Sequence, residues 1–130
     1  MSKKLDNITF KRIKNSKLLD KLLSKNKNII TVKRLKYLKE VFHLYHINVK
    51  SLKIRDTLQK YLIKNNIDAK VHYPIPVHLQ KAAKYLKYRK GDFPISEKLA
   101  NTSLSLPVHE FIDIRHIRHI TKTIFRFFEK

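Results

Sequence analysis

Two stretches of this chain carry most of the information about its fold: VHYPIPVHLQKAAKYLKYRKGDFPISEKLA at residues 71–100 and SLSLPVH at residues 103–109. Pro74 and Pro76 each fix their own φ angle and lack a backbone N–H, so no helix interior or central strand can run through them. The segment YPIPVH, residues 73–78, therefore predicts a stiff, extended turn.

Short elements are predicted on the C-terminal side of that turn. We expect a short helix over residues 77–87 and then a loop through Gly91–Asp92. Pro94 suits the first position of a helix over residues 95–101, because its missing N–H has no partner to lose there. Residues 104–109 predict a short extended piece.

The rest of the chain divides by hydrophobic periodicity. The predicted elements are, in chain order, an amphipathic helix over residues 10–25, a short strand over 29–32, a basic connector over 33–40, a strand over 41–49, a helix over 51–66, a strand over 67–73 and a last helix over 113–128. Together with the elements above, this order predicts a small α+β layer structure. We divide it into an N-terminal helix and connector, residues 1–40, and a small α+β domain, residues 41–130.

Local chemistry supports two of these elements. Alternate side chains of residues 41–49 point to opposite faces of the strand. The bulkier face, which we expect to meet the core, has His43, Tyr45, Ile47 and Val49, and the other face has Phe42, Leu44, His46 and Asn48. Ser51 is a suitable N-cap for the helix over 51–66, and Asn65–Asn66 supplies a left-handed residue at its C-terminus.

Length and composition exclude several classes of protein. A chain of 130 residues with 42% hydrophobic residues forms one packed domain rather than a disordered segment. The absence of cysteine excludes disulfides and thiolate chemistry, and a single glycine excludes glycine-rich phosphate loops. The longest uncharged stretch, residues 99–109, is too short to cross a membrane, and the N-terminus does not resemble a secretory signal. We expect a soluble, cytoplasmic protein.

The charge of the chain is +20, from 30 basic and 10 acidic residues. Lysine, isoleucine and asparagine make up 46 residues, which is the composition that AT-rich codons produce, and the charge is spread along the chain. This favours a solvated basic surface with weak, nonspecific binding of nucleic acid. The alternative is a functional site for a polyanion, supported mainly by the excess charge within residues 1–41.

Seven histidines raise the question of a metal site. His116 and His119 share a helix face but lie among basic residues that repel a cation, and no carboxylate or cysteine completes the set. His43 and His46 lie on opposite faces of a strand and cannot chelate together. We therefore expect no bound metal.

Several motifs recur in an order typical of one family. They are FHLYHINV at 42–49, HYPIPVHLQ at 72–80, GDFP at 91–94 and SLSLPVH at 103–109. In these motifs, and over roughly residues 11–128, the chain resembles the C-terminal region of the pyridoxal-phosphate-dependent sugar-nucleotide aminotransferases, the DegT/StrS group.

This resemblance implies a small antiparallel sheet flanked by helices, like the C-terminal small domain of a fold-type-I aminotransferase. It also implies that His72, Tyr73 and His78 lie on the substrate side of the site. In the family, a large domain supplies the lysine and the phosphate contacts that hold pyridoxal phosphate, and no lysine here stands in that motif. The resemblance therefore implies that this chain alone binds no cofactor and has no catalytic residue of its own.

Two residues depart from the motifs of the family. Asn66 stands where the family usually has glycine, and His46 stands where an apolar residue is usual, which indicates relaxed packing.

We expect a C-terminal part of an aminotransferase that transfers an amino group to a keto-sugar nucleotide, inactive alone. Its partner is a separate large-domain polypeptide or a second copy, bound through the leucine face of residues 10–25. The alternative is a basic module that binds nucleic acid or another polyanion.

Overall fold

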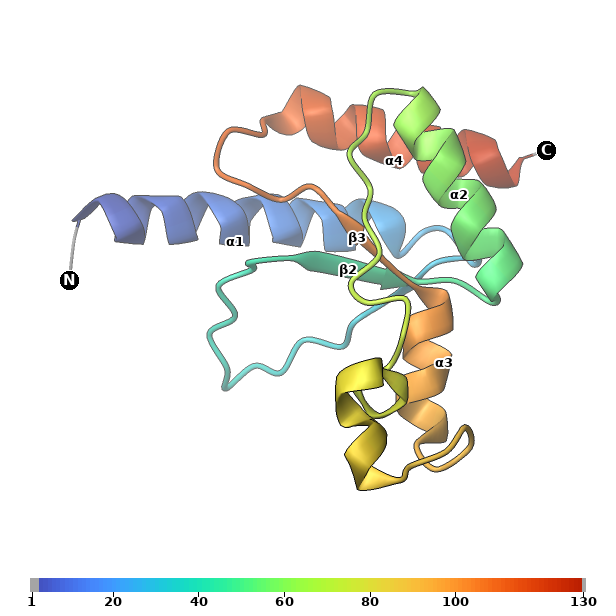
Figure 1. Ribbon diagram of the computed structural model, residues 1–130. Coiled ribbons are helices and arrows are strands. Elements are labelled where there is room, and N and C mark those ends of the chain that lie inside the picture. Colours follow the sequence, from blue (N-terminus) through green and yellow to red (C-terminus); the bar gives the residue numbers. More distant parts are fainter. Residues whose placement is uncertain (1–2, 130) are drawn as a thin grey trace.

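Helices and short strands alternate in the computed structural model, which describes residues 3–129. The elements are α1 (Lys3–Leu23), β1 (Ile30–Thr31), β2 (Tyr45–Asn48), α2 (Leu52–Lys64), the 3-10 turns η1 (Val77–Leu79) and η2 (Lys81–Leu86), α3 (Pro94–Thr102), β3 (Ser103–Leu106) and α4 (Ile114–Phe128). Figure 1 shows α2 and α4 above the sheet, and α3 with the two 3-10 turns below it.

The strands form one antiparallel sheet in the order β1-β2-β3, which confirms the expected α+β class. Alternation along β2 divides its side chains as predicted: Tyr45 and Ile47 are completely buried, whereas His46 and Asn48 lie on the other, partly exposed face. The sheet therefore has one apolar face and one polar face.

The apolar face meets a single core. The helices contribute leucines and isoleucines to it, and the strands contribute the facing side chains: Leu19, Leu23, Leu58, Leu62, Ile117, Ile120, Ile124, Tyr45, Ile47, Leu104 and Leu106. Because Leu19 and Leu23 are completely buried against α4 and the sheet, the leucine face of α1 is not the free docking surface that the sequence suggested. Leu5 and Phe10, which are 50% and 66% exposed, are the large apolar side chains that α1 leaves uncovered.

Local capping fixes both ends of α2, as predicted. The hydroxyl of Ser51 accepts a hydrogen bond from the N–H of Ile54. At the other end Asn66 has a φ of 61°, and the N–H of Ile67 reaches back to the carbonyl of Leu62 at 3.0 Å. This is the Schellman arrangement that a left-handed residue makes possible.

The connector between β1 and β2 is held by ion pairs. Arg34 contacts Asp20 of α1 at 3.1 Å and Glu40 at 2.9 Å, and Asp20 also accepts a hydrogen bond from the Tyr45 hydroxyl at 2.7 Å. Burial, together with this hydrogen bond, raises the pKa of Tyr45 far above its ordinary value. The phenol thus stays protonated and keeps the connector against α1 and β2.

Four predicted boundaries were wrong. The segment 67–73 is not a strand but makes one isolated bridge, between Lys70 and Ser105. The strand predicted over 41–49 shortens to β2, since Phe42 has a φ of 53° and leaves the extended region. The helix predicted over 77–87 is instead two 3-10 turns, and α1 begins well before residue 10.

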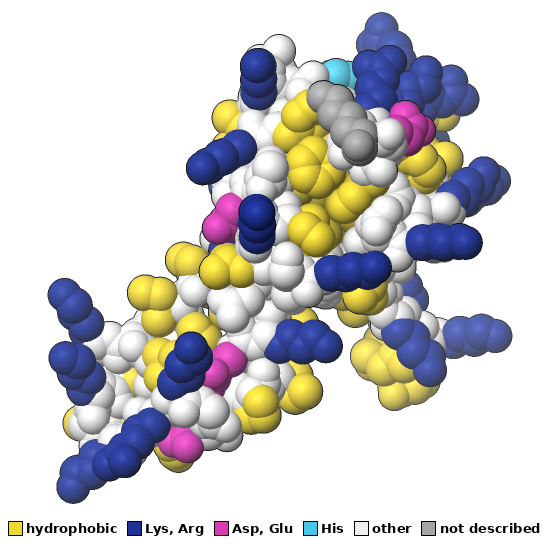
Figure 2. Space-filling view, turned by 90° about the vertical axis from the view of Figure 1, so that its right-hand side faces the viewer, with side chains coloured by type: hydrophobic (Ala, Val, Ile, Leu, Met, Phe, Trp, Pro, Cys, Tyr) yellow, Lys and Arg dark blue, Asp and Glu magenta, His cyan; other side chains and the backbone are white. Residues whose placement is uncertain are grey.

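Positive charge is spread over the surface. On the face in Figure 2, lysine and arginine side chains are distributed over the whole view, some singly and some in groups at its upper right and lower left, with hydrophobic side chains between them. Among the described residues, no helix is both long enough and apolar enough to cross a membrane.

Candidate functional site

The proline-containing turn lies over the polar face of the sheet and encloses a hollow of about 340 Å³. We call it the turn hollow. Its walls come from β2 and β3, from the turn itself and from α3, and they include His46, Asn48, Ser103, His72, Tyr73, Val77 and Leu99. Two of the three residues expected on the substrate side, His72 and Tyr73, thus line the same space.

His72 is held by a chain of two hydrogen bonds. Its Nδ1 lies 2.9 Å from the Ser105 hydroxyl, which in turn lies 3.1 Å from Nδ1 of His46. Ser105 is only 3% exposed and stands directly opposite His46 in the β2–β3 ladder. Burial, and then the positive charges of His72 and Arg34, lower the pKa of His46.

Tyr73 lines this hollow and is exposed to solvent. Its side chain is 69% exposed, and its ring packs edge-on against His72 with 5.8 Å between the ring centres. A phenol in this position can donate a hydrogen bond to a ligand in the hollow.

His78 lies elsewhere: it lines none of the hollows described here. Its Nε2 is 3.1 Å from Oε1 of Glu97, and the same carboxylate oxygen accepts a hydrogen bond from the Gly91 N–H at 2.7 Å. The imidazole also packs on Phe93, with ring centres 4.8 Å apart. First the Gly91 N–H and then His78 lower the pKa of Glu97. His78 therefore connects η1 to α3 and stabilises the turn without lining the turn hollow.

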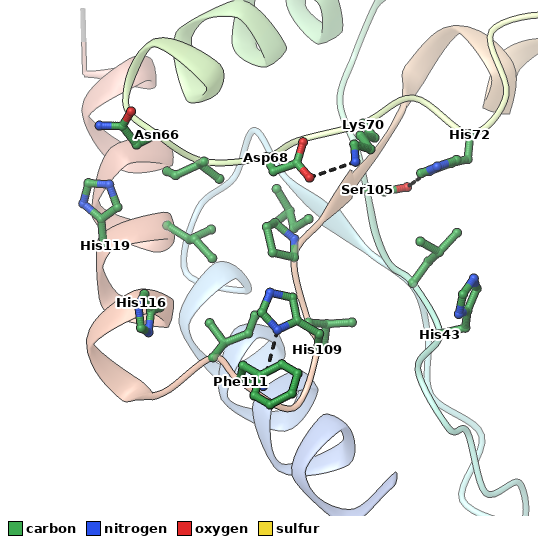
Figure 3. Close-up of a pocket in the computed structure, with 17 residues that line it drawn as sticks. His43, Asn66, Asp68, Lys70, His72, Ser105, His109, Phe111, His116 and His119 are labelled. Carbon is green, nitrogen blue, oxygen red and sulfur yellow. Dashed lines mark hydrogen bonds and ion pairs between the residues drawn. The ribbon is translucent and has the colours of Figure 1, made fainter. Parts of the chain in front are cut away.

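A second hollow, of about 410 Å³, lies on the other side of the segment 66–72 (Figure 3). We call it the histidine hollow. Its floor is apolar, and its polar residues include His43, His109, His116, His119, Asp68 and Lys70. His72 and Ser105 also line it, and His72 therefore lies at the boundary between the two hollows. Nothing in the sequence spacing indicated this second space, because its walls come from segments distant in sequence.

Two histidines of this hollow, both on α4, have structural partners. Nδ1 of His116 accepts a hydrogen bond from the Asp113 N–H at the start of α4, and Nε2 of His119 lies 2.9 Å from the carbonyl oxygen of Asn65. Within residues 3–129, no group of three or more candidate ligands could hold a metal ion.

Known proteins share the sequence pattern of this chain. The sequence profile of the DegT/DnrJ/EryC1/StrS aminotransferase family matches residues 2–125. The chain belongs to this family. The motifs of residues 72–109 had indicated it, and the whole described fold lies inside the matched region apart from the end of α4.

Curated relatives of this DegT/StrS-type chain include sugar transaminases. One is the dTDP-3-amino-3,6-dideoxy-alpha-D-galactopyranose transaminase of Aneurinibacillus thermoaerophilus, 34% identical over 85 residues, which are 65% of this chain and 23% of that protein. Another is the pleiotropic regulatory protein of Geobacillus stearothermophilus, 32% identical over 126 residues, which are 95% of this chain and 33% of that protein. The chain thus spans a quarter to a third of the length of these relatives.

Solved structures show the same fold. DesV of S. venezuelae, crystallised in complex with a ketimine intermediate, superimposes with a TM-score of 0.88 at 24% identity, over 96% of this chain and 33% of DesV. An aminotransferase of the same family from Brucella abortus gives a TM-score of 0.83 at 24% identity, over 95% of this chain and 32% of the other.

The described residues do not fit a complete site for pyridoxal phosphate. Such a site needs a lysine amine held inside a cavity and donors for the phosphate. Of the lysines described, Lys70 alone lines either hollow. The Lys70 side chain is 60% exposed, and its ammonium lies 2.9 Å from a carboxylate oxygen of Asp68.

Proposed function

We propose that this chain supplies the substrate side of an aminotransferase that transfers an amino group to a keto-sugar nucleotide. The single observation that carries the proposal is the family match over residues 2–125, in a chain that spans about a third of its relatives. The cofactor, its lysine and its phosphate donors then come from a large domain outside these 130 residues. The cytoplasmic location expected from the sequence is part of this proposal.

The three residues expected on the substrate side take different roles in it. His72 and Tyr73 contact the substrate, since both line the turn hollow. His78 acts indirectly: its contact with Glu97 holds the turn that carries the other two. The partner is a separate large-domain polypeptide, or a second copy of the chain within a larger assembly.

Complementation of activity tests this proposal. The full chain is assayed for amino transfer from glutamate to a keto-sugar nucleotide, alone and mixed with a family relative truncated before the matching third. We expect no turnover from the chain alone and turnover from the mixture, because the cofactor site and the substrate side then meet. Turnover by the isolated chain would contradict the proposed division of the site.

Matched variants show whether the activity of the mixture comes from this site. Tyr73→Phe should reduce turnover, whereas Tyr85→Phe should not, because Tyr85 is 79% exposed on η2 and lies outside the turn hollow. His72→Asn should reduce turnover more than His43→Asn. Equal effects of the paired substitutions would count against a substrate role for His72 and Tyr73.

A basic module that binds nucleic acid or another polyanion remains the alternative function. It differs from the first proposal in needing no second polypeptide. The salt dependence of DNA binding and the location of the binding surface distinguish this function from the first.

A further inference from the structure

Three polar side chains form a row on the polar face of the sheet: His46 of β2, Ser105 of β3 and His72 of the adjoining segment. The backbone fixes this row, since Ser105 pairs with His46 on one side and with Lys70 on the other. The Ser105 hydroxyl is buried and lies within 3.1 Å of both Nδ1 atoms. Figure 3 shows the part of the row between Ser105 and His72.

A serine hydroxyl has one proton, so it donates one hydrogen bond and accepts others. Ser105 is buried and the two Nδ1 atoms are the partners of its hydroxyl within residues 3–129, so the hydroxyl proton must go to one of them. When both imidazoles are neutral, that ring accepts at Nδ1 and the other ring donates its Nδ1–H to the serine oxygen. The two rings are then opposite tautomers. The protonation of one nitrogen of His46 thus determines which nitrogen of His72 carries a proton.

The other ring nitrogen of His72, Nε2, has no hydrogen-bond partner within residues 3–129. Whether Nε2 carries a proton therefore follows from the state of Nδ1, and so from His46.

We propose that His46 is a positioning residue: through the Ser105 hydroxyl it holds His72 in a single tautomer, opposite to its own, and so fixes the state of the nitrogen Nε2 of His72. This deepens, and rests on, the proposed function, since His72 lines the space assigned to the substrate. A carbonyl or phosphate oxygen matches a protonated Nε2, and a sugar hydroxyl, which donates and accepts, matches either form. The histidine at position 46, first interpreted as relaxed packing, thus has a specific partner.

The test is nitrogen NMR of the full chain labelled with ¹⁵N-histidine, without substrate. The charged and titratable groups near the row are His46, His72, Arg34 and the exposed phenol of Tyr73, so spectra are recorded across the titration of both histidines. In the neutral state we expect each ring to be a single tautomer, with the proton on Nδ1 of one histidine and on Nε2 of the other. Both rings in the same tautomer, or a mixture of tautomers for His72, would overturn the proposal.

Variants separate positioning from simple packing. Ser105→Ala should turn the pure His72 tautomer into a mixture, and Ser105→Thr, which keeps the hydroxyl, should restore it. His46→Leu should also produce a mixture, because Ser105 is then free to donate or accept. The matched control is His43→Leu, an exposed histidine outside the row, which should change nothing. A His72 tautomer unchanged in both Ser105→Ala and His46→Leu would overturn the proposal.

These measurements need no turnover. Failure of the tautomer prediction therefore leaves the proposed function standing, and failure of complementation leaves the tautomer result standing. The two proposals can be rejected independently.

Discussion

At the scale of single residues, Glu97 connects two segments of the chain. Its carboxylate is the common acceptor for the Gly91 backbone and the His78 imidazole, so one side chain joins the loop before α3 to the turn that carries His72 and Tyr73. Both contacts favour the ionised carboxylate, and the pKa of Glu97 is lowered accordingly. We therefore expect the charge state of Glu97 to affect how firmly the turn is held.

Glu97→Gln should reduce stability in a pH-dependent way. A carboxyl whose pKa is lowered by folding stabilises the protein above its unfolded pKa, and this stabilisation is lost as the pH falls through its folded pKa. We therefore expect the difference in Tm between wild type and variant to be present at neutral pH and to shrink on acidification. Thermal unfolding across that range measures it.

The matched control for Glu97 is Asp68→Asn. Asp68 pairs with Lys70 on an exposed part of the surface, where such pairs contribute roughly 0–1 kcal/mol. Its effect on Tm should be small and flat with pH. An equally flat difference for Glu97→Gln would show that the ionised carboxylate does not hold the turn.

At the scale of elements, the end of α2 decides how the chain reaches the site. Asn66 adopts a left-handed conformation that reverses the chain direction, and the segment that follows runs past β3 to His72. Most side chains resist this conformation, whereas glycine adopts it freely and asparagine adopts it more readily than most. The turn therefore depends on the residue type at one position.

Substitutions at Asn66 should follow this backbone preference. Asn66→Ala should lower the free energy of unfolding by about 1 kcal/mol, because alanine is strained at positive φ. Asn66→Gly should leave it unchanged or nearly so, since glycine relieves the strain but gains chain entropy on unfolding. Urea denaturation measures both, with Asn101→Ala in the exposed part of α3 as a control that should cost nothing. Equal losses for alanine and glycine would show that conformation is not the determinant.

The elements that the sequence predicted well are those set by neighbours in the chain. Ser51 and Asn66 act on their own helix, and alternation along β2 needs only adjacent residues. The segment 67–73 failed because its residues look extended, but only Lys70 meets a partner strand. The row at His72 lay beyond local patterns: Ser105 is 59 positions from His46, and only the register of β2 with β3 brings them together.

At the scale of the whole molecule, the distribution of charge predicts how the protein meets polyanions. On the face in Figure 2, lysine and arginine side chains occur at several separate places rather than in one cluster. Binding to DNA should therefore be insensitive to sequence, with dissociation constants of roughly 10⁻⁴–10⁻⁶ M at physiological salt and a steep loss as salt rises. Fluorescence anisotropy with random and defined fragments at two salt concentrations measures this.

Two double variants locate the binding surface. Lys17→Gln with Lys21→Gln removes two exposed charges from α1, and Lys84→Gln with Lys87→Gln removes two from the region of η2. Spread charge predicts equal losses of affinity for the two pairs. A loss confined to one pair, or tight binding that selects a sequence, would favour the alternative function over the aminotransferase proposal.

The contact between α1 and α4 also bears on how the molecule is made. The Asn15 amide donates to the carbonyl of Ile112, 97 positions later in the chain, so the first and last helices close the core together. The entropy of closing so long a loop rises only slowly with its length, but pairings distant in sequence slow folding. During synthesis, Leu19 and Leu23 therefore lack part of their native packing until α4 has emerged from the ribosome. At this stage the nascent chain exposes apolar surface, which favours aggregation and chaperone binding.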